Sequence, residues 1–237
     1  MNKRTIILLT MIISFIWVSS AHSNLCIGCH PDIGKGHNYI HSAVNIGCES
    51  CHKIITGKEH PDGKNSIKLK SDLPELCFHC HKKSKFTKKY VHMPIDKGMC
   101  ILCHNPHQSD NKNLLLFNEP REVCYRCHAK EKFNKKYAHK VAEGGCGIRC
   151  HSHHSSDYPK LLSSNINDMC SGCHLEQNSG IHIVSLPRGK VHPIYLKKDP
   201  GNKTKEMTCI SCHNPHGSKY RKLFTHKNIC NRCHRSF

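Results

Sequence analysis

The feature that most constrains this chain is a cysteine motif that recurs nine times along its 237 residues. All 18 cysteines occur in pairs, and histidine directly follows every pair. Eight pairs read Cys-x-x-Cys-His, whereas the ninth, Cys146-Gly-Ile-Arg-Cys150-His151, is one residue longer. Cys-x-x-Cys-His is the attachment signature of c-type haem, in which both thiols form thioethers and the imidazole binds the iron.

The motifs therefore predict nine covalently bound haems. The predicted attachment residues are Cys26, Cys29, Cys48, Cys51, Cys77, Cys80, Cys100, Cys103, Cys124, Cys127, Cys146, Cys150, Cys170, Cys173, Cys209, Cys212, Cys230 and Cys233. Zinc sites and disulfide scaffolds also use paired cysteines. A zinc site needs two such pairs for each metal, however, and neither alternative requires a histidine after every pair.

The first 23 residues have the pattern of a secretory signal peptide. Basic residues near Met1 precede an apolar run from Ile6 to Val18, and small residues follow. The alternative is an uncleaved membrane anchor, but about 20 apolar residues are needed to span a bilayer and this run is shorter. We expect residues 1–23 to be removed on export, which leaves one multihaem domain over 24–237 in the periplasm or outside the cell, with no transmembrane helix.

The composition predicts an irregular fold. Only 37% of the residues are hydrophobic, below the 45–50% that is typical of globular domains. Such a chain cannot bury a large core by itself, so the haems must supply much of the apolar surface. We expect mostly irregular structure with short α-helices at the motifs, little or no β-sheet, and a repeat wrapped around a chain of haems.

The formal net charge of +19 has two interpretations. A basic chain can bind nucleic acid, but haem propionates also offset an excess of lysine. We favour the second interpretation and expect no nucleic-acid partner. The basic residues that remain suit an acidic redox partner protein, and association with a membrane complex or self-assembly stays open.

Two kinds of motif alternate along the chain. Type A begins at Cys26, Cys77, Cys124, Cys170 and Cys230, and type B begins at Cys48, Cys100, Cys146 and Cys209. The first three type A motifs are followed by Tyr-x-His, whose histidine lies 11 residues after the motif histidine, and the fourth by a longer link that ends at His192. Three type B motifs have a further histidine three residues after the motif histidine, whereas the first has His60 eight residues after it.

These recurring histidines are candidate second ligands for the irons. The predicted motif ligands are His30, His52, His81, His104, His128, His151, His174, His213 and His234, and the predicted distal ligands are His41, His60, His92, His107, His139, His154, His192 and His216. In the Cys146 copy, His154 rather than His153 aligns with His107 and His216. Methionine is a poor alternative ligand because two of the four mature methionines directly precede motif cysteines.

Eight patterned histidines cannot serve nine haems, and two assignments are open. In the first, Tyr-x-His serves the following type B haem and the histidine after type B serves the next type A haem. The first haem then needs His37 or another unpatterned histidine such as His182. In the second, each distal histidine serves the haem just before it, and the last haem lacks a ligand. We favour the first assignment, with His37.

The pattern resembles the doubled CXXCH-motif family of multihaem cytochromes. Cys100–His128, Cys146–His174 and Cys209–His234 carry the resemblance, and Cys48–His81 carries it more weakly. It implies bis-histidine haems packed in a chain, an extracytoplasmic location and an electron-transfer role. We therefore expect an electron carrier or conduit of a respiratory chain rather than an enzyme. The alternative is a multihaem reductase, for instance of nitrogen oxyanions, with one open haem.

Overall fold

The computed structural model describes residues 21–147, 149–178, 182 and 191–234. Most of the predicted signal peptide lies outside these residues. The chain divides into two units, of which one contains residues 1–81 and 97–118 and the other contains 82–96 and 119–237. No helix among the described residues is long and apolar enough to cross a lipid bilayer.

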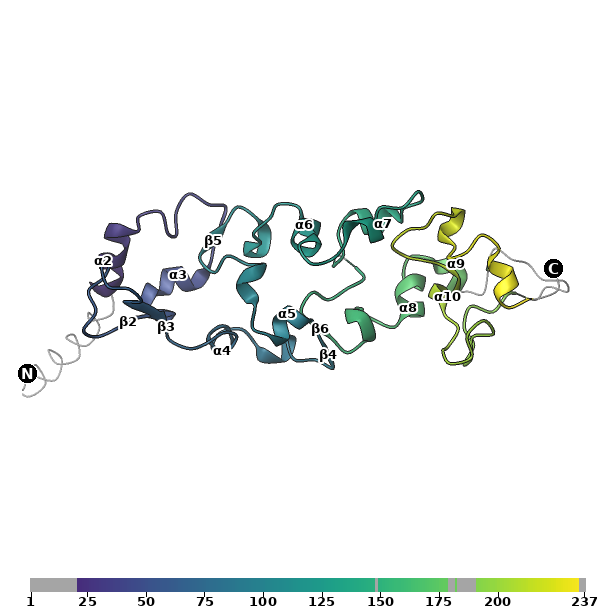
Figure 1. Cartoon of the computed structure of the whole chain (residues 1–237), viewed down its shortest axis with the longest axis horizontal. Coiled ribbons are helices and arrows are strands. Elements are labelled where there is room, and N and C mark those ends of the chain that lie inside the picture. The colour runs from purple at the N-terminus through teal and green to yellow at the C-terminus, as the bar shows by residue number, and fades with distance from the viewer. Residues whose placement is uncertain (1–20, 148, 179–181, 183–190, 235–237) are drawn as a thin grey trace, which may run out of the picture. The chain divides into compact units, whose positions relative to one another are not determined.

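The first unit consists of short helices and two small sheets. Its α-helices are α2 (Ala21–Cys29), α3 (Ser42–Ile46) and α4 (Glu75–Phe78), and its 3-10 helices are η1 (Cys48–Ser50), η3 (Cys100–Leu102) and η4 (Lys112–Leu114). Strand β1 (Tyr39–Ile40) pairs with β5 (Gln108–Ser109), and β2 (His52–Ile54) pairs with β3 (Ile67–Leu69), both antiparallel. Figure 1 shows β2 and β3 side by side.

The second unit repeats this pattern. Its α-helices are α5 (Met93–Asp96), α6 (Pro120–Tyr125), α7 (Lys140–Glu143), α8 (Ile166–Ser171), α9 (Leu175–Asn178) and α10 (Cys209–Cys212). Its 3-10 helices are η2 (Lys83–Lys85), η5 (Lys130–Lys132), η6 (Pro159–Leu161), η8 (Arg221–Leu223) and η9 (Ile229–Arg232). Strand β4 (Tyr90–Val91) pairs antiparallel with β6 (Ser155–Ser156), and the two are labelled together in Figure 1.

The polypeptide by itself buries very little apolar surface. Among the described residues, only Leu162 and Met207 are buried hydrophobic side chains. Apolar residues beside motif cysteines are exposed instead, such as Leu25 at 75% and Ile101 at 54%. Large exposed apolar surfaces are normally covered by a ligand or a partner. The expectation of short helices, irregular structure and little sheet is confirmed.

Candidate haem-binding sites

Each of the eight Cys-x-x-Cys-His motifs includes a helical turn that gathers its three functional side chains. In Cys-x-x-Cys-His these residues occupy positions i, i+3 and i+4, which lie on one face of a helix. The His30 amide donates to the Cys26 carbonyl at 2.9 Å, and His81, His128 and His174 make the same bond at 2.9 Å in later type A motifs. The turn therefore presents two thiols and one imidazole on the same side, as covalent haem attachment requires.

Three type B motif histidines are oriented by a left-handed turn that the sequence did not indicate. Their Nδ1 atoms lie 2.8, 3.0 and 2.7 Å from backbone carbonyl oxygens nine residues downstream, in the pairs His104–Asn113, His151–Lys160 and His213–Lys222. The residue that supplies each carbonyl, and the leucine after it, have φ of 56–58°. Non-glycine residues pay a conformational cost there, so the turn has a positioning role.

A buried serine stabilises each of these turns. The hydroxyl groups of Ser109, Ser156 and Ser218 donate to the carbonyl oxygens of Leu115, Leu162 and Phe224. Each hydroxyl also accepts a backbone N–H two residues later at 3.0 Å. The sequence shows these serines as recurrent residues, but only the structure shows that they close the turn that holds the motif histidine.

Strand pairing between repeats positions the Tyr-x-His histidines. Tyr39 and Ile40 pair with Ser109 and Gln108 in β1–β5. In the second unit, β4 pairs with β6, and Tyr137 forms an isolated bridge with Ser218. The segment before each of these three histidines is therefore attached to the loop after the type B motif of the following repeat, as Tyr39 is to Ser109 after the motif at Cys100.

The same contacts fix the orientation of the distal imidazoles. The Nδ1 atoms of His41, His92 and His139 lie 2.8, 2.9 and 3.2 Å from the carbonyl oxygens of Pro106, His153 and Pro215. A carbonyl oxygen can only accept, so Nδ1 carries the hydrogen and Nε2 keeps its lone pair. Such a bond also makes the imidazole a more basic metal ligand.

The structure brings seven motif histidines into pairs with a second histidine. The ring-centre distances are 6.2 Å for His30–His60, 6.0 Å for His52–His107, 6.0 Å for His81–His41, 6.2 Å for His128–His92, 6.0 Å for His151–His216, 6.2 Å for His174–His139 and 6.3 Å for His234–His192. One iron bound to both imidazoles at about 2 Å separates their centres by about 6 Å. These side chains therefore fit six-coordinate haems.

Neither of the two assignments made from the sequence agrees with these pairs. The ring of a Tyr-x-His histidine lies beside the motif histidine of the type A motif in the next repeat, as in His139 with His174. The histidine after a type B motif lies beside the motif histidine of the type B motif one repeat earlier, as His216, which follows the motif at Cys209, lies beside His151. Apart from His30–His60, the pairs therefore join neighbouring repeats, because contacts such as the β1–β5 and β4–β6 strand pairs bring together residues that are distant in sequence.

His37 does not occupy the place expected for it. The ring paired with His30 is that of His60, which the β2–β3 hairpin presents and whose Nδ1 lies 3.1 Å from the buried hydroxyl of Ser66. The His37 Nδ1 atom lies 3.1 Å from a carboxylate oxygen of Asp110. Lys88, at the matching position, lies 3.4 Å from Asp157, so His37 replaces the lysine of a repeated ion pair.

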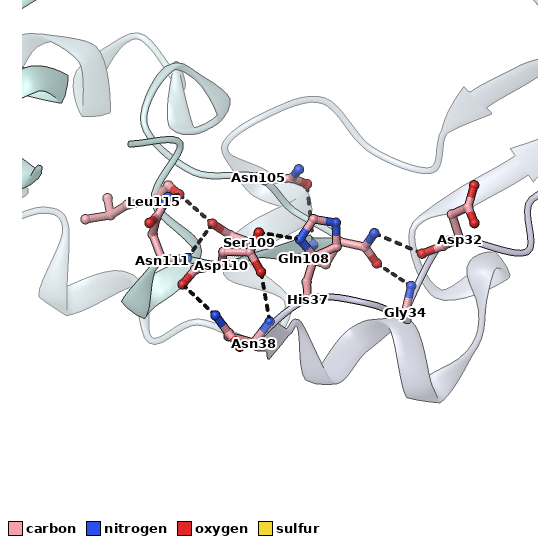
Figure 2. A network of polar contacts seen from close by, with 10 residues as sticks. All are labelled: Asp32, Gly34, His37, Asn38, Asn105, Gln108, Ser109, Asp110, Asn111 and Leu115. Atoms are coloured by element: carbon pink, nitrogen blue, oxygen red, sulfur yellow. Dashed lines mark hydrogen bonds and ion pairs between the residues drawn. The ribbon is translucent and has the colours of Figure 1, made fainter. Parts of the chain in front are cut away.

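The surroundings of His37 form one polar network, shown in Figure 2. The Asn38 amide donates to Asp110 at 3.1 Å, and the Gln108 side chain donates to the Asp32 carbonyl at 2.9 Å. These bonds connect the segment before His41 to the loop that carries His107. The network therefore supports two distal ligands without contributing one.

The contacts of His154 distinguish it from its neighbour His153. The His154 ring centre lies 4.9 Å from that of Phe86, and His216 has the matching contact with Phe133 at 5.1 Å. The His153 ring lies so close to Gly147 that a Cβ there would be 1.7 Å from it. His154 therefore shares with His216 both its register position and its contact with a phenylalanine ring.

Burial keeps two distal imidazoles neutral. It lowers the pKa of His107, and positive charge on His52 and His41 acts in the same direction. Burial also lowers the pKa of His216, with smaller contributions from His151 and Lys160. The neutral imidazole is the form that binds a metal ion.

Cysteines of successive motifs lie next to each other within each unit. In the first, the Cys48 thiol is hydrogen-bonded to Cys26, and burial together with Cys100 raises the pKa of Cys77 to about 11. In the second, a hydrogen bond joins the Cys170 and Cys209 thiols and lowers the pKa of Cys209 to about 7. Because each haem is attached through these thiols, neighbouring motifs place haem edges close together.

Comparison with known proteins agrees with this geometry. The family described as "Doubled CXXCH motif" matches residues 41–86, 92–133, 139–179 and 202–237, which together make up more than half of the chain. The chain belongs to the doubled CXXCH-motif family. The first three matches begin at His41, His92 and His139, which are the distal histidines of the Tyr-x-His segments.

The chain is also similar to the multiheme cytochrome MtrA of Shewanella baltica (strain OS185). It is 29% identical over 92 residues, which cover 37% of this chain and 26% of the relative. The matched stretch is thus about a quarter of the relative's length. The chain is a multihaem c-type cytochrome with covalently bound haem c, as the motifs predicted, and the resemblance to the doubled CXXCH-motif family is confirmed.

Proposed function

We propose that this chain is an extracytoplasmic electron conduit of nine bis-histidine haems in a respiratory chain. The pairing of motif and distal histidines at 6.0–6.3 Å carries the proposal. When bound, haem irons supply one-electron exchange between ferric and ferrous states. Two imidazoles on each iron leave no open position for a substrate, so the arrangement suits an electron carrier rather than an enzyme.

The distal ligands follow from the ring pairs and the repeat. Six of them form pairs in the structure, and all but His192, which ends a longer link, recur at fixed register positions: His41, His92, His107, His139, His192 and His216. We assign His60 to the first haem because its ring faces His30. His154 is a distal ligand because it shares the register and the aromatic contact of His216.

The protein's contribution to electron transfer is to hold the haems and to set their potentials. Contacts between successive motifs, such as Cys26–Cys48 and Cys170–Cys209, provide a path along each unit. Carbonyl oxygens that accept from Nδ1 make the imidazoles stronger donors, which stabilises the ferric state. Two imidazole ligands also give a lower potential than histidine with methionine. We therefore expect low potentials and redox partner proteins as donor and acceptor.

The test is the spin state of the protein as isolated after export. Nine haem masses on the mature chain, low-spin electron paramagnetic resonance signals and no carbon monoxide binding after reduction are expected. A dominant high-spin signal, or carbon monoxide binding at several haems, would contradict the conduit. Secretion with cleavage near residue 23, measured by intact mass, tests the proposed location.

A further inference from the structure

We propose that two phenylalanines of the repeat are positioning residues that fix the orientation of distal imidazoles. Phe133 holds the ring of His216, and Phe86 holds the ring of His154. Each phenylalanine lies six residues before a Tyr-x-His histidine, in the link that follows a type A motif. The inference rests on the proposed bis-histidine conduit, because it assigns these phenylalanines to ligands of that conduit.

The phenylalanine rings contact the imidazoles directly. The ring centres of Phe133 and His216 are 5.1 Å apart, with 72° between the ring planes. Those of Phe86 and His154 are 4.9 Å apart, with 48° between the planes. Aromatic rings attract each other at centre distances of about 4.5–7 Å and favour an edge-on approach. An imidazole bound to iron through one nitrogen can still rotate about that bond, so a ring packed against it restricts the rotation.

The surroundings of Phe133 hold its own ring in place. Its backbone N–H closes η5 by donating to the Lys130 carbonyl at 3.0 Å. Its ring centre lies 5.9 Å from that of Tyr125, which directly follows the motif cysteine Cys124. Phe133 is half-buried, whereas the residues directly before and after it are exposed. The ring is therefore attached to a type A motif and forms a fixed surface for the imidazole.

The two classes of distal imidazole are oriented in different ways. The Nδ1 atom of each of the three Tyr-x-His histidines lies near a backbone carbonyl oxygen, as His139 lies near Pro215. His216 is held at its backbone, where its N–H donates to the Asn214 side chain at 3.1 Å, and at its ring by Phe133. Contacts that orient a metal ligand also tune the metal, so the phenylalanine has the role that the carbonyl oxygen has elsewhere.

The first repeat provides an internal comparison. Lys35 occupies the register position of the phenylalanine there. The imidazole planes of His52 and His107 differ by 41°, whereas those of the pair that contains His216 differ by 21°. The angle between two axial imidazole planes sets the splitting of the iron d orbitals, and a larger angle gives a larger maximum g value in electron paramagnetic resonance. The contact with phenylalanine therefore has a spectroscopic signature.

The test compares Phe133→Leu with Tyr158→Leu. Tyr158 is an aromatic residue of the same unit whose side chain is exposed, so it is a matched control. We expect Phe133→Leu to retain nine low-spin haems and to increase the maximum g value of one of them, because the planes are free to turn away from 21°. Tyr158→Leu should leave every g value unchanged. Unchanged g values in Phe133→Leu would overturn the proposal.

Two further variants identify the haem and the property of the side chain that matters. In a chain with Cys146→Ser and Cys150→Ser, Phe133→Leu should change none of the remaining g values, and a change there would contradict the assignment to the haem served by His216. Phe133→Tyr keeps the ring and should keep the original spectrum. A shift as large as that of Phe133→Leu would contradict a role for ring packing.

The matching position separates positioning from a folding defect. If Phe133→Leu does not fold, Phe86→Leu makes the same test on His154, and it should raise the maximum g value of one other haem. Unchanged g values there would overturn the proposal. His216→Ala should bind one carbon monoxide per reduced chain. A variant that binds none would contradict the ligand assignment of the conduit itself, which distinguishes that failure from a failure of the phenylalanine role.

Discussion

Replacement of His139 by alanine separates the observed pairing from both arrangements that the sequence left open. His139 lies between the motifs at Cys124 and Cys146, so sequence proximity assigns it to one of those haems. The structure instead places its ring 6.2 Å from His174, at the motif that begins with Cys170. The variant should therefore open the haem held by Cys170 and Cys173.

The size of the effect follows from the contacts of this side chain. One iron in nine loses an imidazole, so one high-spin haem should appear and one carbon monoxide should bind per reduced chain. The variant also loses the bond from Nδ1 to the Pro215 carbonyl, which contributes about 0.5–1.5 kcal/mol to the free energy of unfolding. The exposed, unpatterned His79 provides a control, and His79→Ala should bind no carbon monoxide.

Motif deletions show which haem has opened. With Cys170→Ser and Cys173→Ser, His139→Ala should add no carbon monoxide binding, because the haem it serves is absent. With Cys124→Ser and Cys127→Ser, the same substitution should still add one equivalent. The opposite result would refute the cross-repeat pairing and restore local ligation.

The other predictions concern stability and haem content. Ser156→Ala removes the donor to the Leu162 carbonyl and the acceptor of the Tyr158 N–H. It should lower the free energy of unfolding by about 1–3 kcal/mol. The control Ser164→Ala removes a half-buried hydroxyl with a weak 3.4 Å bond to the Asn165 carbonyl, and it should change the free energy by less than about 0.5 kcal/mol in denaturant titrations. Equal effects would contradict the role of the serine. A chain produced without haem should show a largely unfolded circular dichroism spectrum, because only Leu162 and Met207 are buried apolar residues among those described; a cooperative thermal transition would contradict this. The intact mass of the exported protein should show nine haems, and eight would indicate failure at the longer motif.

The strand pairs explain why the sequence predicted the distal histidines better than their partners. Recurrence at fixed offsets identified His41, His92 and His139 as a set. Their partners depend on β1–β5, on β4–β6 and on the Tyr137–Ser218 bridge, which join segments of different repeats. Strands of two residues leave almost no periodic signal in a sequence, so local spacing favoured the nearest haem.

The sequence also predicted the roles of the residues that depart from the repeat only in part. His37 was predicted to be a haem ligand because it replaces a lysine of the repeat, but its Nδ1 lies beside a carboxylate oxygen of Asp110. His60 lies eight residues after His52 rather than three, and only the β2–β3 hairpin brings its ring to His30. The left-handed turns at Asn113 and Lys160 have no glycine to mark them.

The sequence by itself determined the covalent chemistry of this protein. Two thiols and an imidazole at i, i+3 and i+4 come together in one helical turn, so the attachment residues and motif ligands are local properties of the chain. Low hydrophobic content likewise predicted a fold without a polypeptide core. Only the tertiary structure decided which second imidazole lies opposite each of seven motif histidines, because a second axial ligand needs a position about 6 Å from the first ring, and contacts between distant segments produce that distance.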